Sequence, residues 1–296
     1  MKSSVIGVNF PKATSPLNVS SALADIERCG FDCAELTMTT FPLIIGGDVS
    51  WTYVNYLKSI LSQHNLIYTA HIGSGLNLRK LDEHDLHRNV LRSTLDVCDA
   101  LDMRLLTVHF EEASRILAEE AAFMDAHAEM ANYAKSKGIL LCIENIEVEH
   151  HTRVIDMIRQ IDHDHFKMTL DIGHLNLSTA YFGGSFETAV AECAPYVRHI
   201  HLSDNTGRFE KMRLTNFPLY KTLNMNMRIS LGYGDIHIPP FWGKIPIRQT
   251  LQTLQNDGYD GIYLCEYENS LYAPFNQEIQ ACVRTAVETA RQGVTK

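Results

Sequence analysis

Six short apolar runs in this chain end at a side chain that can bind a metal ion or transfer a proton. These side chains are His71, His109, Glu144, Asp171, His201 and Glu266, and His174 follows three residues after Asp171. A single histidine or glutamate at the end of a strand is commonly a hydrogen-bonded loop residue. Six together indicate a metal site if the ends meet, because carboxylates around one axis repel each other unless a cation lies between them.

The acidic members of this group predict an oxygen-rich metal site. The residues that would form it are Glu144, Asp171, His201 and Glu266. Three carboxylates and one imidazole suit Mn, Mg or Co and also permit Zn, with coordination positions left for a substrate. His71 and His109 suggest a second, nitrogen-rich site that shares Glu144 and favours Zn. Alternatively, these two histidines bind substrate hydroxyls, and the sequence leaves both interpretations open.

The elements that must position these residues alternate regularly between strand and helix. We expect strands at 4–10, 31–38, 66–71, 104–109, 139–144, 166–171, 197–201 and 261–266. We expect helices at 18–29, 51–64, 82–101, 113–137, 153–161, 186–194, 247–256 and 276–291. Eight such units without an intervening linker predict an α/β fold, a single (β/α)8 TIM-barrel domain over residues 1–296, in which all strand ends meet at one mouth. A doubly wound sheet is the alternative, but no G-x-G-x-x-G follows the first strand.

One stretch, residues 205–245, departs from this alternation. It follows the seventh predicted strand and shows no clear periodicity over about 40 residues, which is long for a loop between a strand and a helix. On the carboxyl face of a barrel such loops usually shape the pocket. We therefore expect this segment to cover the mouth and to contribute to ligand binding.

Composition restricts the class of protein. Hydrophobic residues make up 45% and charged residues 21%, as in globular proteins, and no apolar run approaches the ~20 residues that cross a bilayer. Residues 1–10 lack the features of a signal peptide, and the seven cysteines include no C-x-x-C pair, so we expect reduced thiols in the cytoplasm. A net charge of −9 argues against a nucleic-acid partner, and neither composition nor hydropathy suggests a membrane partner. A homo-oligomer stays an open alternative.

Seven local motifs occur in an order and spacing that resemble a known superfamily. They are H-I-G-S-G-L-N-L at His71, T-V-H-F at His109, C-I-E-N at Glu144, L-D-I-G-H at Asp171, H-I-H-L-S-D at His201, L-G-Y-G-D-I at Gly232 and Y-D-G-I-Y-L-C-E at Glu266. The set resembles the xylose isomerase-like TIM-barrel superfamily over almost the whole chain. That superfamily groups sugar isomerases and epimerases, inosose dehydratase-like and isomerase-like proteins, and zinc-dependent apurinic-site endonucleases.

Resemblance to the epimerase branch implies one divalent metal and a sugar or related polyol as substrate. The metal would be held by Glu144, Asp171, His201 and Glu266, and the two glutamates would also act as the acid/base pair. Proton transfer next to a carbonyl would then proceed through an enediolate. The same resemblance gives substrate contacts to His174 and to an arginine after the seventh strand, for which Arg208 is the nearest candidate and Arg228 the second.

Three other functions remain as alternatives. An inosose dehydratase-like lyase would use the same enolate chemistry, and a non-catalytic sugar-binding domain would use the same pocket. The endonuclease branch needs a third zinc site, for which His174 matches one ligand. Asn226 and Arg228 stand where an aspartate and a histidine are required, so we expect this third site to be broken unless a rearranged loop recruits Asp235 and His237.

Overall fold

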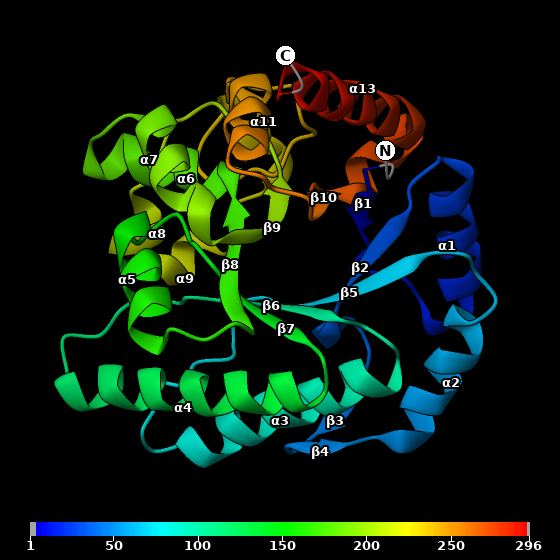
Figure 1. Cartoon of the computed structure of the whole chain (residues 1–296), viewed down its shortest axis with the longest axis vertical. Coiled ribbons are helices and arrows are strands. Elements are labelled where there is room, and N and C mark those ends of the chain that lie inside the picture. The colour runs from blue at the N-terminus through cyan, green and yellow to red at the C-terminus, as the bar shows by residue number, and fades with distance from the viewer. Residues whose placement is uncertain (1–3, 295–296) are drawn as a thin grey trace.

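Eight parallel strands close a barrel in a computed structural model of the protein, which describes residues 4–294 (Figure 1). The strands are β1 (Ile6–Asn9), β2 (Cys33–Thr37), β5 (Ile67–Ile72), β6 (Leu105–His109), β7 (Leu140–Glu144), β8 (Phe166–Asp171), β9 (Val197–Leu202) and β10 (Ile262–Cys265). They pair around the ring in the order β1-β10-β9-β8-β7-β6-β5-β2. This closure confirms the predicted TIM barrel; of the predicted domain, residues 1–3 and 295–296 lie outside the described part.

Helices surround the barrel and bury one face each against it. They are α1 (Val19–Arg28), α2 (Trp51–Leu61), α3 (His84–Ala100), α4 (Leu117–Ser136), α5 (His151–Ile161), α7 (Phe186–Cys193), α11 (Ile247–Asn256) and α13 (Asn276–Val294). In α5, for example, Val154, Ile155 and Ile158 recur at helical spacing and are buried, and the helix ends at Asp162 in the left-handed conformation. Strands covered by helices outside and by side chains inside are buried on both faces, which explains their nearly continuous apolar runs.

A helix that the sequence did not predict follows β8 directly. The sequence predicts the next helix only at 186–194, but α6 (Ile172–Phe182) begins directly after Asp171. The Asp171 carboxylate accepts a hydrogen bond from the backbone N–H of His174 at 2.6 Å, which caps the first turn. A Cβ atom at Gly173 would lie 2.1 Å from Ser203 Oγ, so the glycine is needed because α6 starts against the end of β9.

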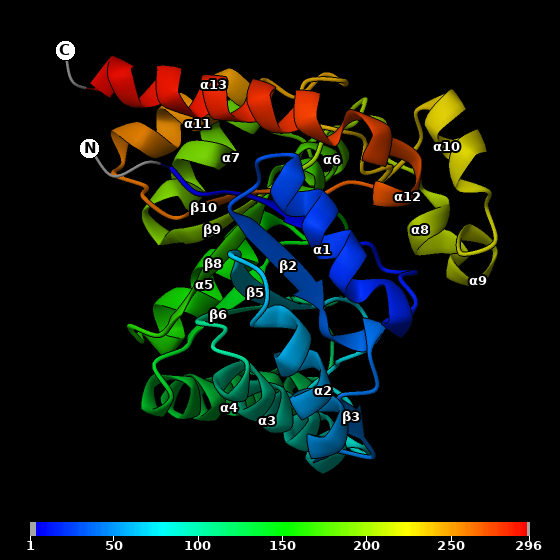
Figure 2. The same cartoon turned by 90° about the vertical axis from the view of Figure 1, so that its right-hand side faces the viewer.

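The segment after β9 folds into short helices over one end of the barrel. They are α8 (Met212–Thr215), α9 (Phe217–Tyr220) and α10 (Met225–Leu231), and the short α12 (Asn269–Tyr272) lies on the same side. Figure 2 shows these four helices on the side of the barrel away from the two chain ends. Helices of one or two turns show too little periodicity in the sequence to be predicted. The same holds for the short hairpin of β3 (Ile44–Ile45) and β4 (Asp48–Val49).

The length and hydropathy of the helices bear on membrane insertion. Among residues 4–294, none combines the length and the apolar character that a bilayer-crossing helix requires. All seven cysteines have free thiols, and Cys33, Cys98 and Cys265 are fully buried, where burial raises the pKa of each thiol above its ordinary value.

Candidate metal centre

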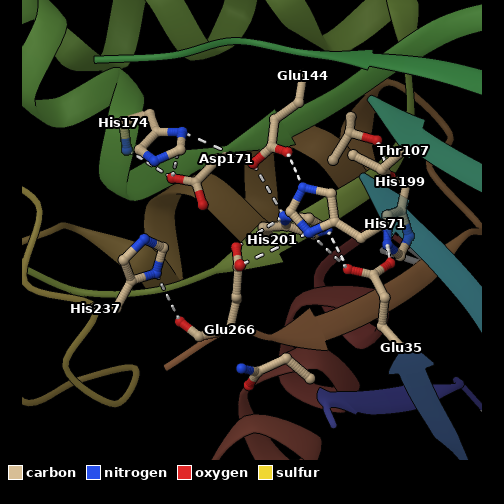
Figure 3. A network of polar contacts seen from close by, with 12 residues as sticks. Glu35, His71, Thr107, Glu144, Asp171, His174, His199, His201, His237 and Glu266 are labelled. Carbon is tan, nitrogen blue, oxygen red and sulfur yellow. Dashed lines mark hydrogen bonds and ion pairs between the residues drawn. The ribbon is translucent and has the colours of Figure 1, made fainter. Parts of the chain in front are cut away.

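Four side chains from adjacent strand ends converge at the mouth of the barrel (Figure 3). They are Glu144 at the end of β7, Asp171 at the end of β8, His201 in β9 and Glu266 directly after β10. We call them the four-residue metal set. Each offers a ligand atom that lies within 4.8 Å of the ligand atoms of the other three, and all four residues are buried. The structure thus brings together all the residues that the sequence indicated as metal ligands.

Strand register explains why these side chains meet. Asp171 pairs with His201 across β8 and β9, and alternate residues of a strand point to the same face. Thr169 and His199, two residues earlier on each strand, therefore also point into the barrel. The Thr169 hydroxyl forms a 2.8 Å hydrogen bond with that of Thr107 on β6. The barrel interior is consequently polar one layer below the metal set.

That lower layer contains the carboxylate of Glu35. This residue lies in the predicted strand 31–38, and the sequence predicts no function for it. Glu35 of β2 is 1% exposed, and its Oε1 lies 3.0 Å from His201 Nε2. Its Oε2 accepts a hydrogen bond from Thr69 at 3.0 Å and lies 3.0 Å from His199 Nε2. Burial favours the neutral acid, but the imidazoles of His201 and His199 lower the pKa of Glu35 to about 2. Glu35 thereby directs the other nitrogen of His201, Nδ1, toward the metal set.

The oxygens of the set lack the partners that buried oxygens normally have. His201 Nδ1 lies 3.1 Å from Glu144 Oε1 and 2.9 Å from Glu266 Oε2. Within residues 4–294, Glu144 Oε2, Asp171 Oδ2 and Glu266 Oε2 are all buried without a hydrogen-bond partner. Since buried polar atoms are almost always satisfied, one unpartnered oxygen on each of three converging carboxylates fits a divalent cation.

Electrostatics of the set point the same way. Burial favours the neutral form of Glu144, but the imidazoles of His201, His109 and His71 hold the pKa of Glu144 well below its ordinary value. Burial alone would lower the pKa of His201, yet Glu144, Glu35 and Glu266 raise it well above its ordinary value. Burial, together with the charges of Glu144 and Glu266, raises the pKa of Asp171 to about 6. A bound cation would relieve the strain between these carboxylates.

Two histidines of the neighbouring strands lie against the same glutamate. His71 Nε2 is 3.1 Å and His109 Nε2 is 3.3 Å from Glu144 Oε2, and these three residues form a second group with converging ligand atoms. Both imidazoles also line the cavity above the metal set. The arrangement permits either of the two predicted roles, a second metal site or contacts to substrate.

A third group of residues with converging ligand atoms joins His174 of α6 to Asp235 and His237 of the loop after α10, which is the alternative to a broken site that the sequence left open. His174 Nε2 lies 3.4 Å and His237 Nε2 lies 2.8 Å from Asp235 Oδ2. The Nδ1 atoms face backbone carbonyls, of Asn145 at 2.9 Å for His174 and of Glu266 at 3.4 Å for His237. A proton on Nδ1 leaves Nε2 with a free lone pair, which is the tautomer that a metal ligand requires.

The loop after α10 reaches this position because Asp204, just after β9, anchors the loop's C-terminal part. Asp204 and Ile238 exchange backbone hydrogen bonds of 2.9 and 3.2 Å. The Asp204 carboxylate also accepts hydrogen bonds from the N–H groups of Gly243 at 2.9 Å and Ile245 at 3.0 Å. This anchoring places the preceding Asp235 and His237 over the mouth. Motif spacing points to Asn226 and Arg228 instead, so the sequence indicates Asp235 and His237 only as an alternative.

The cavity above the metal set has a volume of about 450 Å³. Its floor consists of five side chains, His71, His109, His174, His237 and Glu266. Glu144, Asp171 and His201 do not line the cavity, but Glu144 Oε2 lies 3.1 Å from His71 Nε2 and His201 Nδ1 lies 2.9 Å from Glu266 Oε2, so Glu144 and His201 both contact this floor. The segment after β9 contributes nine lining residues, which confirms that it shapes the pocket: Arg213, Phe217, Tyr220, Lys221, Leu223, Met225, Arg228, Asp235 and His237.

Arg208, the nearest candidate for a substrate-binding arginine, lies elsewhere. It is exposed, its Nη1 donates to the carbonyl of Leu231 at 3.1 Å, and its guanidinium lies 4.8 Å from the ring centre of Tyr233. It does not line the cavity, whereas Arg213 and Arg228 do. The prediction for Arg208 rested on its separation from His201 along the chain, which carries no information about how the short helices turn.

Comparison with known proteins agrees with the fold. The family described as xylose isomerase-like TIM barrel matches residues 23–289. The chain belongs to this family. A D-psicose 3-epimerase of Ruminiclostridium cellulolyticum is 22% identical over 198 residues, which span 60% of this chain and 64% of that protein.

Solved structures share the fold of this family member. A D-tagatose 3-epimerase-like protein has a TM-score of 0.72 and 20% identity and covers 98% of this chain and 99% of its own. A xylose isomerase-like TIM-barrel protein of Mycobacterium smegmatis, in complex with magnesium, has a TM-score of 0.73 and 16% identity. The alignment covers 98% of this chain and 100% of that protein's chain. Identities this low establish the architecture, so the reaction has to be argued from the site itself.

The role of Glu35 leads to a testable prediction. Replacing Glu35 by Gln keeps the size of the side chain but removes the charge that orients His201. We expect metal affinity to fall by about 10- to 100-fold, the usual effect of losing such a partner, while the fold is retained. Titration of Mn²⁺ into chelator-stripped protein measures this change. Glu112→Gln, an exposed site, is the matched control, and equal affinity of both variants would refute the role.

Proposed function

We propose that this protein is a metal-dependent sugar epimerase or isomerase that moves a proton next to a carbonyl group. The observation that carries the proposal is the pair of glutamates on the two flanks of the metal set, each within 3.1 Å of His201 Nδ1. An epimerase needs an acid and a base around one carbon atom. The D-psicose 3-epimerase relative supports the same class of reaction.

A divalent cation fits the four-residue metal set and would be held by Glu144, Asp171, His201 and Glu266. When bound, it supplies a Lewis acid that stabilises negative charge developing on substrate oxygens. The set is rich in oxygen, so Mn, Mg or Co are the expected ions, with Zn also permitted.

The two glutamates occupy unequal positions, which suggests how they divide the reaction. Glu266 lines the cavity and would remove the proton from the carbon next to the carbonyl. Glu144 is fully buried behind the imidazoles of His71 and His109 and would return a proton from the other flank. Burial favours the neutral acid that the return step needs, and it opposes the neighbouring imidazoles, which hold the pKa of both glutamates well below its ordinary value.

The imidazoles of the cavity floor would orient the substrate. His71, His109 and His174 are three side chains that can donate or accept hydrogen bonds to hydroxyl groups, and all three line the cavity. Asn9 and Asn269 line it as well. The Asn269 amide donates to the backbone carbonyl of Asn9 at 2.6 Å, and the Asn9 amide donates to the backbone carbonyl of Tyr267 at 3.0 Å, which fixes both amides. Such polar groups provide the ligand's orientation in a sugar site.

Exchange of the substrate's α-proton with solvent tests the assignment. In Glu266→Gln we expect exchange in deuterated water to fall by about 10²- to 10⁴-fold, because the residue that removes the proton is lost. In Glu144→Gln, studied at saturating metal, exchange should persist on one face while formation of the epimer falls by a similar factor. NMR with a ketose substrate measures both.

The control and the contradicting result follow from the same measurement. Glu112→Gln changes an exposed carboxylate outside the cavity and should leave exchange unaltered. Undiminished exchange in Glu266→Gln, with metal bound, would remove this residue from the proton transfer.

The third ligand group favours one second candidate, metal-assisted hydrolysis of a phosphoester. His174, Asp235 and His237 add a further metal-capable site to the two that include Glu144. Several cations around one cavity are suited to stabilising the attacking and leaving oxygens of a phosphoryl group.

Metal stoichiometry separates the two functions. For an epimerase we expect one tightly bound divalent ion per chain by elemental analysis after gel filtration, and for a hydrolase three. His237→Ala should leave the count unchanged in the first case and lower it by one in the second. Three ions per chain would therefore contradict the primary proposal.

A further inference from the structure

One side of the cavity carries positive charge that the metal set and its histidines do not explain. Arg213 in α8, Lys221 after α9 and Arg228 in α10 all line the cavity, and we call them the basic wall. They come from the segment that closes over the mouth, whereas the floor comes mainly from strand ends. The cavity therefore has a metal-binding, hydroxyl-binding floor and a cationic wall.

Arg228 is the distinctive member because it is buried without a countercharge. It is 8% exposed, and no carboxylate of residues 4–294 lies within ion-pair distance of its guanidinium. Its Nη2 donates to the Tyr220 hydroxyl at 2.6 Å and to the backbone carbonyl of Asp235 at 2.5 Å. Its Nε is buried without a hydrogen-bond partner among the described residues. Burying a cation in this way is costly unless an anion completes the site.

The neighbouring carboxylate is not free to serve as that anion. Asp235 presents its carbonyl to Arg228, while its Oδ2 lies 3.4 Å from His174 Nε2 and 2.8 Å from His237 Nε2. A glycine at position 234 allows this packing, since a Cβ there would lie 3.3 Å from Arg228 Nη2, and its φ is +70°. The backbone thus holds the guanidinium in place without neutralising it.

The other two cations flank one aromatic ring. The guanidinium of Arg213 lies 4.5 Å and the Lys221 Nζ lies 5.3 Å from the ring centre of Phe217. Arg213 is partly neutralised by Glu147, whose Oε1 accepts from Nε at 2.7 Å. Lys221 forms no ion pair within the described part of the chain, and it lines the cavity. Arg228 and Lys221 are therefore the two members of the wall that have no ion-pair partner among residues 4–294.

We infer that the basic wall binds the phosphate of a phosphorylated sugar while the sugar's carbonyl end faces the floor. This inference rests on the proposed function, because it names the substrate class of the same cavity. A phosphate monoester carries close to two negative charges and several acceptor oxygens, which match the buried guanidinium and the ammonium group. A glycine-rich phosphate loop is unnecessary, because side chains supply the charge.

Equilibrium binding to the metal-loaded full chain tests the inference independently of turnover. The probes are a ketopentose, its 5-phosphate ester, a sugar acid of similar size and inorganic phosphate. We expect the phosphate ester to bind about tenfold or more tightly than the neutral ketose, with inorganic phosphate as a competitor. In Arg228→Gln this preference should largely disappear.

Two further variants keep the test decisive if the buried arginine is needed for folding. Lys221→Gln lies at an exposed position and should reduce the preference about threefold without affecting stability. Arg115→Gln, exposed and outside the cavity lining, is the matched control and should retain the full preference. Circular dichroism of each variant verifies the fold.

The possible results divide clearly. Three results would overturn the inference. The first is equal affinity for the ketose and its phosphate ester, and the second is a sugar acid that binds as tightly as the ester. The third is a phosphate preference that stays unchanged in both Arg228→Gln and Lys221→Gln. A retained phosphate preference without solvent exchange at the α-carbon supports the basic wall and refutes only the epimerase proposal. Release of inorganic phosphate from the bound ester likewise supports the wall and favours the hydrolytic alternative.

Discussion

The repulsion among buried carboxylates at the barrel mouth is the constraint on which the rest of this structure depends. Glu144, Asp171 and Glu266 converge on a single imidazole, that of His201, in a region from which water is largely excluded. The three carboxylates cannot move apart, because each is fixed at the end of a strand whose register is set by the closed barrel. Positive charge has to come to the carboxylates, either as protons on imidazoles or as a metal cation.

The layers of side chains above and below the metal set place imidazoles next to these carboxylates. Beneath the metal set, Glu35 faces His201 and His199, so one imidazole is oriented by a carboxylate from below and surrounded by carboxylates above. Above it, the floor histidines separate the set from the cavity. A ligand in the cavity therefore meets imidazoles and Glu266 first, while the remaining metal ligands lie protected beneath them.

Much of the barrel and of its metal set could be predicted from the sequence, for a physical reason. Strand ends of a parallel barrel point to one mouth, so a residue's position in its strand fixes its place in space. Residues 212–237 follow no such rule: their path depends on tertiary contacts such as those of Asp204, which no periodicity reveals. This is why the sequence indicates Asp235 and His237 beside His174 only as an alternative, and why it does not show that Arg208 stays outside the cavity.

The most direct test of the account is to locate the metal. In crystals grown with Mn²⁺, anomalous diffraction should show a peak within coordination distance of carboxylate oxygens of Glu144, Asp171 and Glu266 and of Nδ1 of His201. A fully occupied peak at that place is the result this account predicts. A protein that holds Mn²⁺ only elsewhere, or crystals without an anomalous peak at saturating Mn²⁺, would contradict it.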